Sequence, residues 1–147
     1  MKALIQRVSS ASVRVDGTTV GAIEKGLLVL LGVAKKNSES DVRYLAEKVC
    51  HLRIFPNDEG KFDRALSDGE GAVLVVSQFT LLADCSKGRR PNFQKAAKPN
   101  EALRLYELFA AEVLKLGIAC EKGQFQAHME VNLCNDGPVT ILLESRA

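Results

Sequence analysis

Most apolar residues of this chain lie in short strand-like runs, and only two stretches have the periodicity of an amphipathic helix. The strand-like runs cover residues 3–8, 12–15, 19–23, 27–33, 72–76, 129–133 and 139–143. Many strands with only two main helices favour an α+β fold, in which a curved, largely antiparallel, barrel-like sheet carries the helices on one side. A parallel βαβ design would need more crossover helices.

Turn and cap residues predict where several of these elements begin and end. Asp16-Gly17 is typical of a hairpin turn between two strands. Residues 38–41, Ser-Glu-Ser-Asp, have the form of a capping box at the start of the first helix. Pro99-Asn100 opens the second helix, and Gly117 is its expected C-terminal stop.

The size and composition of the chain indicate an ordinary globular protein. Its 147 residues fit one domain spanning residues 1–147. Apolar residues make up 46% and charged residues 26%, as in soluble proteins. No apolar run approaches the ~20 residues that cross a bilayer, so we expect no membrane contact. Residues 1–8 enter a strand pattern without a signal peptide, which predicts a cytoplasmic location.

The cysteines and histidines do not form the pattern of a metal site. The four cysteines contain no C-x-x-C pair, and His51 and His128 do not supply the missing ligands. Neither a dinucleotide-binding fingerprint nor a P-loop is present. We therefore expect no metal, no cofactor and four reduced thiols, of which Cys85 is the best candidate for a reactive one.

The first candidate motif is Ser77-Gln78-Phe79-Thr80-Leu81, which follows the apolar run at residues 72–76. The hydroxyls of Ser77 and Thr80 are candidate nucleophiles, but a neutral hydroxyl needs a base. Neither histidine lies in a motif and no G-x-S-x-G elbow is present, so a serine-hydrolase triad is poorly supported. Alternatively, main-chain N–H groups at this strand end stabilise an oxyanion, or the hydroxyls merely satisfy main-chain groups.

The second candidate motif, Asn135-Asp136-Gly137-Pro138-Val139-Thr140, separates the last two strand-like runs. A Gly-Pro pair often marks a plain turn, and this interpretation stays open. Proline is tolerated in a sheet only at a strand start or an edge. Glycine and proline also leave their carbonyl oxygens with little side-chain cover, so these oxygens could approach another molecule closely.

Five basic residues follow the first motif within twelve residues that contain no acid: Lys87, Arg89, Arg90, Lys95 and Lys98. They belong to an expected long loop at residues 84–100, and long loops in compact domains are often functional. A solvated basic loop is one interpretation. The other is a surface for phosphate groups, which contribute affinity without reading base sequence. The net charge of +2 argues against a general nucleic-acid coating protein.

Together the two motifs resemble the signature of the D-aminoacyl-tRNA deacylases, the D-tyrosyl-tRNA deacylase family. Residues 1–8, 26–33 and 53–55 are also similar, so the resemblance covers nearly the whole chain. It implies an ester hydrolase that releases a D-amino acid, or glycine, from aminoacyl-tRNA as a chiral proofreading step in translation. It also implies a homodimer in which the Gly-Pro pair of one subunit enters the active site of the other.

The resemblance assigns substrate contacts to five residues. The main-chain carbonyls of Gly137 and Pro138 grip the amino side of the substrate, which excludes an L side chain. Phe125 and Met129 match positions that line the adenosine pocket of relatives. Arg7 braces the Gly-Pro loop.

The catalytic residues that the resemblance implies are Ser77, Gln78, Phe79 and Thr80. Main-chain N–H groups near Phe79 form the oxyanion hole, and the 2′-hydroxyl of the terminal ribose assists the reaction. Thr80 either orients the substrate or attacks it.

Two other functions remain open. A non-catalytic tRNA- or RNA-binding module of the same fold would retain tRNA without cleaving the ester. A general serine or threonine esterase would depend on the hydroxyl of Thr80, although the chain offers no evident base.

Overall fold

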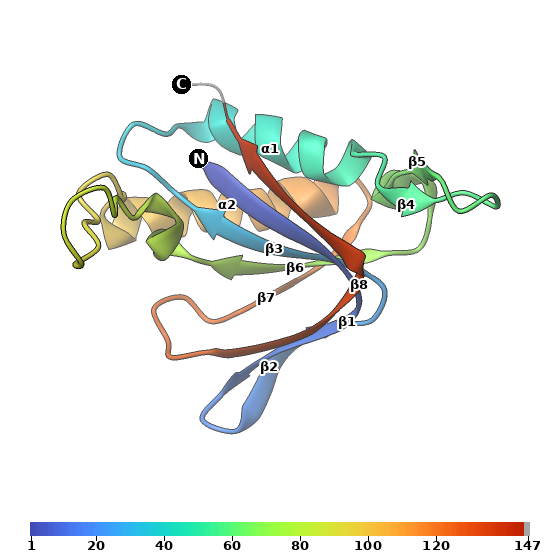
Figure 1. The fold of residues 1–147 in the computed structure, drawn as a ribbon, viewed down its shortest axis with the longest axis horizontal. Coiled ribbons are helices and arrows are strands. Elements are labelled where there is room, and N and C mark those ends of the chain that lie inside the picture. The colour runs from blue at the N-terminus through green and yellow to red at the C-terminus, as the bar shows by residue number, and fades with distance from the viewer. Residues whose placement is uncertain (146–147) are drawn as a thin grey trace.

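A computed structural model describes residues 1–145, which form a curved six-stranded sheet with both long helices on one side (Figure 1). The sheet contains β1 (Lys2–Val15), β2 (Thr18–Ile23), β3 (Gly26–Gly32), β6 (Ala72–Ser77), β7 (Ala119–Lys122) and β8 (Glu130–Glu144). A separate hairpin contains β4 (Phe55–Pro56) and β5 (Phe62–Arg64). The helices are α1 (Glu39–His51) and α2 (Pro99–Lys115), with short 3₁₀ turns η1 (Leu66–Asp68) and η2 (Phe79–Leu82).

The predicted fold class is confirmed: two main helices cover a curved sheet that is nearly a barrel. β1 pairs antiparallel with β2, β3 and β8, as a largely antiparallel sheet requires. The β3–β6 and β6–β7 pairs are parallel, however. α1 lies in the crossover from β3 to β6, and α2 lies in the crossover from β6 to β7. Two helices are therefore enough for the two parallel pairs.

Apolar side chains cover both faces of the central strand β6, which explains its unbroken apolar sequence. On the helix side, Val75 belongs to the cluster that contains Tyr106 and Phe109. On the other side, Leu74 and Val76 belong to a second cluster enclosed by the curved sheet. Successive residues of β6 alternate between the two clusters, so the strand cannot turn about its own axis without exposing apolar side chains. This packing holds the carboxyl end of β6 in place.

The last strand differs from the expected two strands with a loop between them. β8 runs from Glu130 to Glu144 beside β1. Val8 pairs with Asn135 and Gln6 pairs with Thr140, so Arg7 faces residues 136–139, which we call the Gly-Pro bulge. The prediction of two strands is therefore wrong, since the Gly-Pro pair displaces the main chain locally without ending the strand.

Both helices begin, and α2 ends, where the cap residues predict. The N–H of Ser38 donates a hydrogen bond to Oδ2 of Asp41 (2.8 Å), and α1 starts at the next residue. α2 starts at Pro99, and Gly117 follows it with φ of +83°. Within residues 1–145, no helix is long and apolar enough to cross a membrane.

Candidate active site

The first motif turns sharply away from the sheet at the carboxyl end of β6. The N–H of Gln78 donates a hydrogen bond to the main-chain oxygen of Leu31 (2.8 Å), and η2 then begins at Phe79. A Cβ atom on Gly32 would lie 2.6 Å from Cδ2 of Leu82 and 3.1 Å from the main-chain oxygen of Gln78. The glycine therefore allows η2 to pack directly on the end of β3.

A cleft of about 710 Å³ lies at this end of the sheet, within the usual range for small-molecule sites. Ser77, Gln78 and Phe79 of the first motif line it. The rest of its lining comes from the segment before α2 and the first turn of α2 (Phe93, Ala96, Ala97, Pro99 and Ala102), and from the β7–β8 connection and the start of β8 (residues 125–129 and Val131). Ligands of parallel sheets bind at the carboxyl ends of strands, and β6 is parallel to both of its neighbours.

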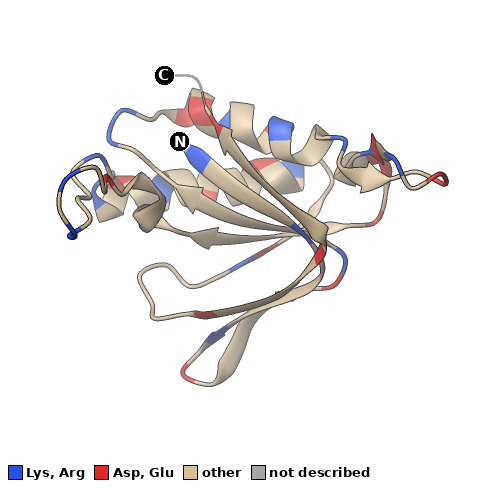
Figure 2. Ribbon diagram, viewed as in Figure 1, with Lys and Arg blue, Asp and Glu red and all other residues tan. Residues whose placement is uncertain are grey.

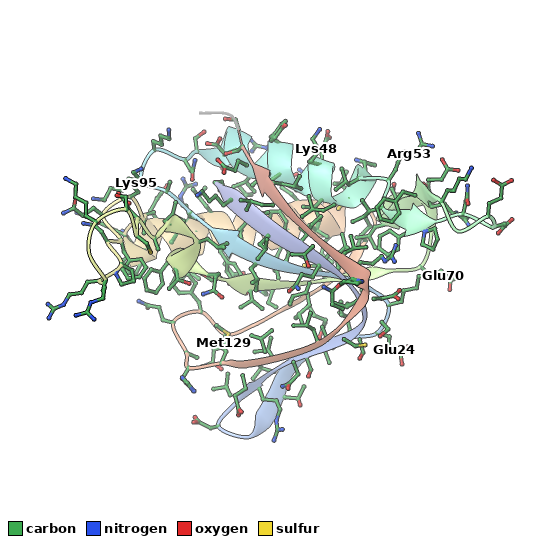
Figure 3. All side chains as sticks on the ribbon, in the orientation of Figure 1. Glu24, Lys48, Arg53, Glu70, Lys95 and Met129 are labelled. Carbon is green, nitrogen blue, oxygen red and sulfur yellow. The ribbon has the colours of Figure 1, made fainter. Side chains whose placement is uncertain are left out.

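Phe125 and Met129 lie in the wall of this cleft, so both sit beside the first motif. The ring of Phe125 packs on that of Tyr106 with centroids 5.9 Å apart. Met129 projects from the β7–β8 connection below β6 (Figure 3). Its sulfur lies 2.9 Å from where a Cβ atom on Gly123 would be.

Tyr106 holds this wall against β6. Its hydroxyl donates to the main-chain oxygen of Val75 (3.1 Å) and lies 3.4 Å from that of Gly123. The N–H of Gly123 also donates to the oxygen of Val75 (3.0 Å). Burial raises the pKa of the Tyr106 hydroxyl, which therefore stays protonated and remains a donor at neutral pH.

Two of the aromatic rings that line the cleft pack on each other. The rings of Phe79 and Phe93 pack edge to face with centroids 5.1 Å apart, and Phe79 remains 55% exposed. An exposed aromatic ring of this kind is a surface on which a nucleobase can stack. The sequence interpretation did not include Phe93, although an aromatic residue inside the basic loop was a possible signal.

Thr80 does not line the cleft and is exposed. Nε2 of Gln78 donates to its hydroxyl oxygen, and the main-chain oxygen of Thr80 accepts from the N–H of Ala83 (3.1 Å). The N–H groups of Phe79 and Thr80 open η2, where a helical turn leaves its first donors without partners. Donors at this strand end are therefore available to a ligand.

The two histidines differ in position. His51 ends α1, where its Nδ1 lies 2.9 Å from the main-chain oxygen of Glu47. His128 is exposed and lines the cleft, outside both motifs. No group of three or more histidine, cysteine, aspartate or glutamate side chains within residues 1–145 could hold a metal ion.

Arg7 is the main support of the Gly-Pro bulge. Its side chain is only 10% exposed, and Nε donates to the main-chain oxygen of Asp136 (3.0 Å). Nη1 donates to the buried main-chain oxygen of Ile54 (2.8 Å). The guanidinium also lies 5.6 Å from the ring centre of Phe62, in the β4–β5 hairpin. One side chain thus joins β1, the bulge and the segment before β4.

Asn135 closes the bulge on its other side. Its Oδ1 accepts a hydrogen bond from the N–H of Val139 (3.1 Å), and its Nδ2 donates to Oγ1 of Thr140 (3.0 Å). The Gly137–Pro138 peptide is cis, and Gly137 has φ of +142°. Gly137 and Pro138 are both exposed. The side chains of Arg7 and Asn135 hold the main chain of the bulge through hydrogen bonds.

The cleft and the Gly-Pro bulge lie at opposite ends of the sheet within one protein chain. In Figure 1, η2 follows the tip of β6 on the left, whereas β8 bends on the right. None of Arg7, Gly137 and Pro138 lines the cleft. The structure thus brings Ser77, Gln78, Phe79, Phe125 and Met129 together and leaves the Gly-Pro residues apart.

The fold and the cleft define a protein of the α+β class with a ligand-sized site at the carboxyl end of a central parallel strand. Its sequence matches the profile of a known family, D-Tyr-tRNA(Tyr) deacylase, over residues 4–144. The chain belongs to this family. The family predicted from the two motifs is confirmed, and with it the prediction of a deacylase, an ester hydrolase.

Individual relatives match over almost the full length. The D-aminoacyl-tRNA deacylase of Heliobacterium modesticaldum is 56% identical over 146 residues, 99% of this chain and 97% of the relative. That of Roseiflexus castenholzii is 59% identical over 145 residues, 99% of this chain and 92% of the relative.

Two solved structures share the fold. A c-Myc DNA unwinding element binding protein superposes with a TM-score of 0.93 at 38% identity, covering 100% of both chains. A probable eukaryotic D-amino acid tRNA deacylase superposes with a TM-score of 0.84 over 97% of this chain and 98% of its own. At 16% identity, this second likeness concerns the fold alone.

Proposed function

We propose that this protein hydrolyses the ester of D-aminoacyl-tRNA, and of glycyl-tRNA, and spares the L-aminoacyl ester. The observation that carries this proposal is the cleft, which gathers Ser77, Gln78, Phe79, Phe125 and Met129 at one strand end. The N–H groups at the start of η2 could bind an ester carbonyl, and the aromatic rings of the cleft could stack on a nucleobase. These are the two parts of an aminoacylated 3′-terminal adenosine.

We assign the terminal adenosine to the part of the cleft bounded by Phe79, Phe125 and Met129. Aromatic and thioether side chains contact a base without requiring a charged partner. The ester carbonyl would then lie over the start of η2, where the N–H groups of Phe79 and Thr80 are free to bind an oxyanion. A single such donor is worth about 3 kcal/mol of barrier.

Chemistry based on main-chain donors does not need a strong side-chain base. Thr80 is exposed and accepts a hydrogen bond from Gln78, which suits an orienting role better than attack. No side chain of the motif is an evident base, so the 2′-hydroxyl of the substrate's terminal ribose would assist the hydrolysis instead.

We propose that a second copy of this chain brings its Gly-Pro bulge to the cleft. Within one chain the bulge lies at the far end of the sheet. β8 pairs only with β1 among the described strands, and exposes Leu133 and Leu142. An isologous homodimer would cover these side chains and would place Gly137 and Pro138 in the partner's site.

The carbonyl oxygens of Gly137 and Pro138 would face the α-carbon of the substrate. A D-aminoacyl group presents hydrogen and the amino group to these oxygens, whereas an L-aminoacyl group presents its side chain and is excluded. Glycine has no side chain to exclude, so glycyl-tRNA is also a substrate on this mechanism.

The site of action follows from the substrate. Charged tRNAs are made and used where translation takes place, so we propose a cytoplasmic location. We also propose that residues 1–147 act as one deacylase domain.

The test is a comparison of three substrates with one tRNA: D-tyrosyl-, L-tyrosyl- and glycyl-tRNA, each followed by release of the labelled amino acid. We expect rapid release of D-tyrosine and glycine, and release of L-tyrosine at the uncatalysed rate. Equal rates for both tyrosine isomers would exclude chiral selection. Retention of tRNA without release of any amino acid would instead support the RNA-binding alternative.

A further inference from the structure

A second hollow of about 690 Å³ lies on the other side of η2, beside Leu82 and Ala83. Four lysines line it, Lys2, Lys35, Lys36 and Lys95, and we call it the lysine groove. Basic residues dominate the loops at this end of the molecule (Figure 2). Lys95 projects from this end, far from Lys48 on α1 (Figure 3).

One short stretch of chain separates the groove from the cleft. Phe93, Ala96 and Ala97 line the cleft, whereas Gln94 and Lys95 line the groove. The two hollows are therefore neighbours that share a wall. A strand of nucleic acid whose last nucleoside lies in the cleft can continue over this wall within a few nucleotides.

The backbone around the groove is held by an antiparallel contact. The N–H of Lys35 donates to the main-chain oxygen of Lys95 (3.0 Å), and the N–H of Ala97 donates to that of Val33 (2.9 Å). The buried side chain of Asn37 accepts a hydrogen bond from the N–H of Ala34 (2.6 Å). Lys35 and Lys95 are thus fixed next to each other, where like charges repel unless an anion lies between them.

The charges of the groove are only partly balanced. Within residues 1–145, Lys35, Lys36 and Lys95 form no ion pair within 4.0 Å, whereas Lys115 and Lys122 each pair with a glutamate. The acids that line the groove are Asp84 and Glu144. Asp84 is already held by Ser86: the side chain of Ser86 and then its N–H (3.0 Å) donate to the carboxylate and lower the pKa of this carboxyl, as does the charge of Lys95 to a smaller extent.

We propose that the lysine groove binds backbone phosphates of the tRNA acceptor stem whose 3′-terminal adenosine occupies the cleft. This inference rests on the proposed function. Lysine binds phosphate as a point charge and does not read base sequence, so the groove accepts many tRNAs. Selection then takes place at the aminoacyl group, and the groove supplies affinity.

The experiment measures binding of a deacylated RNA minihelix that ends in CCA as a function of salt. The variant is the double substitution K35A/K95A. The control is K48A/K61A, which removes the same charge from exposed lysines of α1 and of the β4–β5 turn. Hydrolysis of a D-tyrosyl ester of adenosine alone, which lacks the stem, is measured in parallel.

We expect K35A/K95A to reduce the slope of log K against log salt by about 1 for each lysine. The affinity of the wild type should therefore fall about tenfold more than that of the variant between about 50 and 200 mM salt. The control should keep the wild-type slope. All three proteins should hydrolyse the adenosine ester equally.

Equal slopes for K35A/K95A and the wild type would overturn the proposal. Displacement of the minihelix by inorganic phosphate at constant ionic strength would also overturn it. That result would indicate a site for one small anion instead of a groove that binds several backbone phosphates. If the slope changes as expected but the wild type cleaves no ester, the proposed function fails and the groove remains an RNA-binding surface.

Discussion

The guanidinium of Arg7 donates a hydrogen bond to the main-chain oxygen of Asp136, which lies 129 residues later in the chain. No other described side chain bonds the main chain of the bulge from β1. The position of the Gly-Pro carbonyls therefore depends on a residue that is remote in sequence and, in one protomer, remote from the cleft.

Arg7→Lys should reduce chiral selection. Lysine keeps the charge but cannot donate at once to Asp136 and Ile54. Loss of one charge-assisted hydrogen bond should lower the free energy of unfolding by about 1.5–3 kcal/mol. The ratio of kcat/KM for D- and L-tyrosyl-tRNA should fall. An unchanged ratio in a protein that is merely less stable would show that Arg7 has only a structural role.

Gly32→Ala should impair the first motif by displacing η2, which packs on Gly32. Its new methyl group would meet Leu82 and the main chain of Gln78, so η2 must shift, at a cost of about 1–3 kcal/mol in stability. We expect a lower kcat on D-tyrosyl-tRNA. Gly69→Ala is the matched control, because a Cβ atom there meets nothing within 4 Å. Full activity of Gly32→Ala would mean that the position of η2 is not critical.

Much of the architecture follows from local sequence, because caps and turns are local. Ser38 and Asp41 begin α1 and Gly117 follows the end of α2 where the sequence predicts, and the first motif lies at a strand end as expected. The direction of β6 relative to β3 could not be predicted, since a strand buried on both faces has the same apolar run in either direction. The bulge in β8 is bonded by Arg7 of β1, which no local pattern links to it.

Of the residues that line the cleft, the sequence named Ser77, Gln78 and Phe79 of the motif and, through the resemblance, Phe125 and Met129. It did not point to Phe93 or to Tyr106 behind the wall. Phe93 lines the cleft because the 93–97 segment pairs with residues 33–35, and Tyr106 braces the cleft wall because α2 packs against β6. Their roles depend on tertiary contacts, and an aromatic residue on a helix face is equally typical of an ordinary core position.

Thr80→Ala and His128→Ala should each retain most of the activity. A general acid or base typically contributes about 10²–10⁴-fold, whereas main-chain donors remain in both variants. We expect losses of less than about tenfold in kcat, and a pH profile for His128→Ala that follows the wild type. A loss of a hundredfold or more in either protein would favour side-chain catalysis.

Tyr106→Phe should loosen the cleft wall and lower the free energy of unfolding by about 1–2 kcal/mol through the lost hydroxyl contacts. Because burial raises the pKa of this hydroxyl, the unfolded chain loses its proton first, and stability falls as the pH rises above about 10. The variant should lack that part of the alkaline decrease in thermal unfolding. Tyr44→Phe, on the exposed side of α1, should match the wild type.

Gly137→Ala should disturb the Gly-Pro bulge. Gly137 has φ of +142°, and a Cβ atom there would lie 2.8 Å from Cγ2 of Val139 and 3.2 Å from Nη2 of Arg7. We expect lower activity on D-tyrosyl-tRNA in a folded protein. Gly60→Ala, also at positive φ but with nothing within 4 Å, is the matched control.

Mixing the two defective proteins tests whether one active site draws on two subunits. In a mixed dimer of Gly32→Ala and Gly137→Ala, one site combines the intact first motif of one subunit with the intact bulge of the other. The second site carries both defects. Random exchange in a two-fold dimer should therefore restore about one quarter of wild-type activity. If each chain built its own site, every site would keep one defect and mixing would restore nothing, which would exclude the shared site.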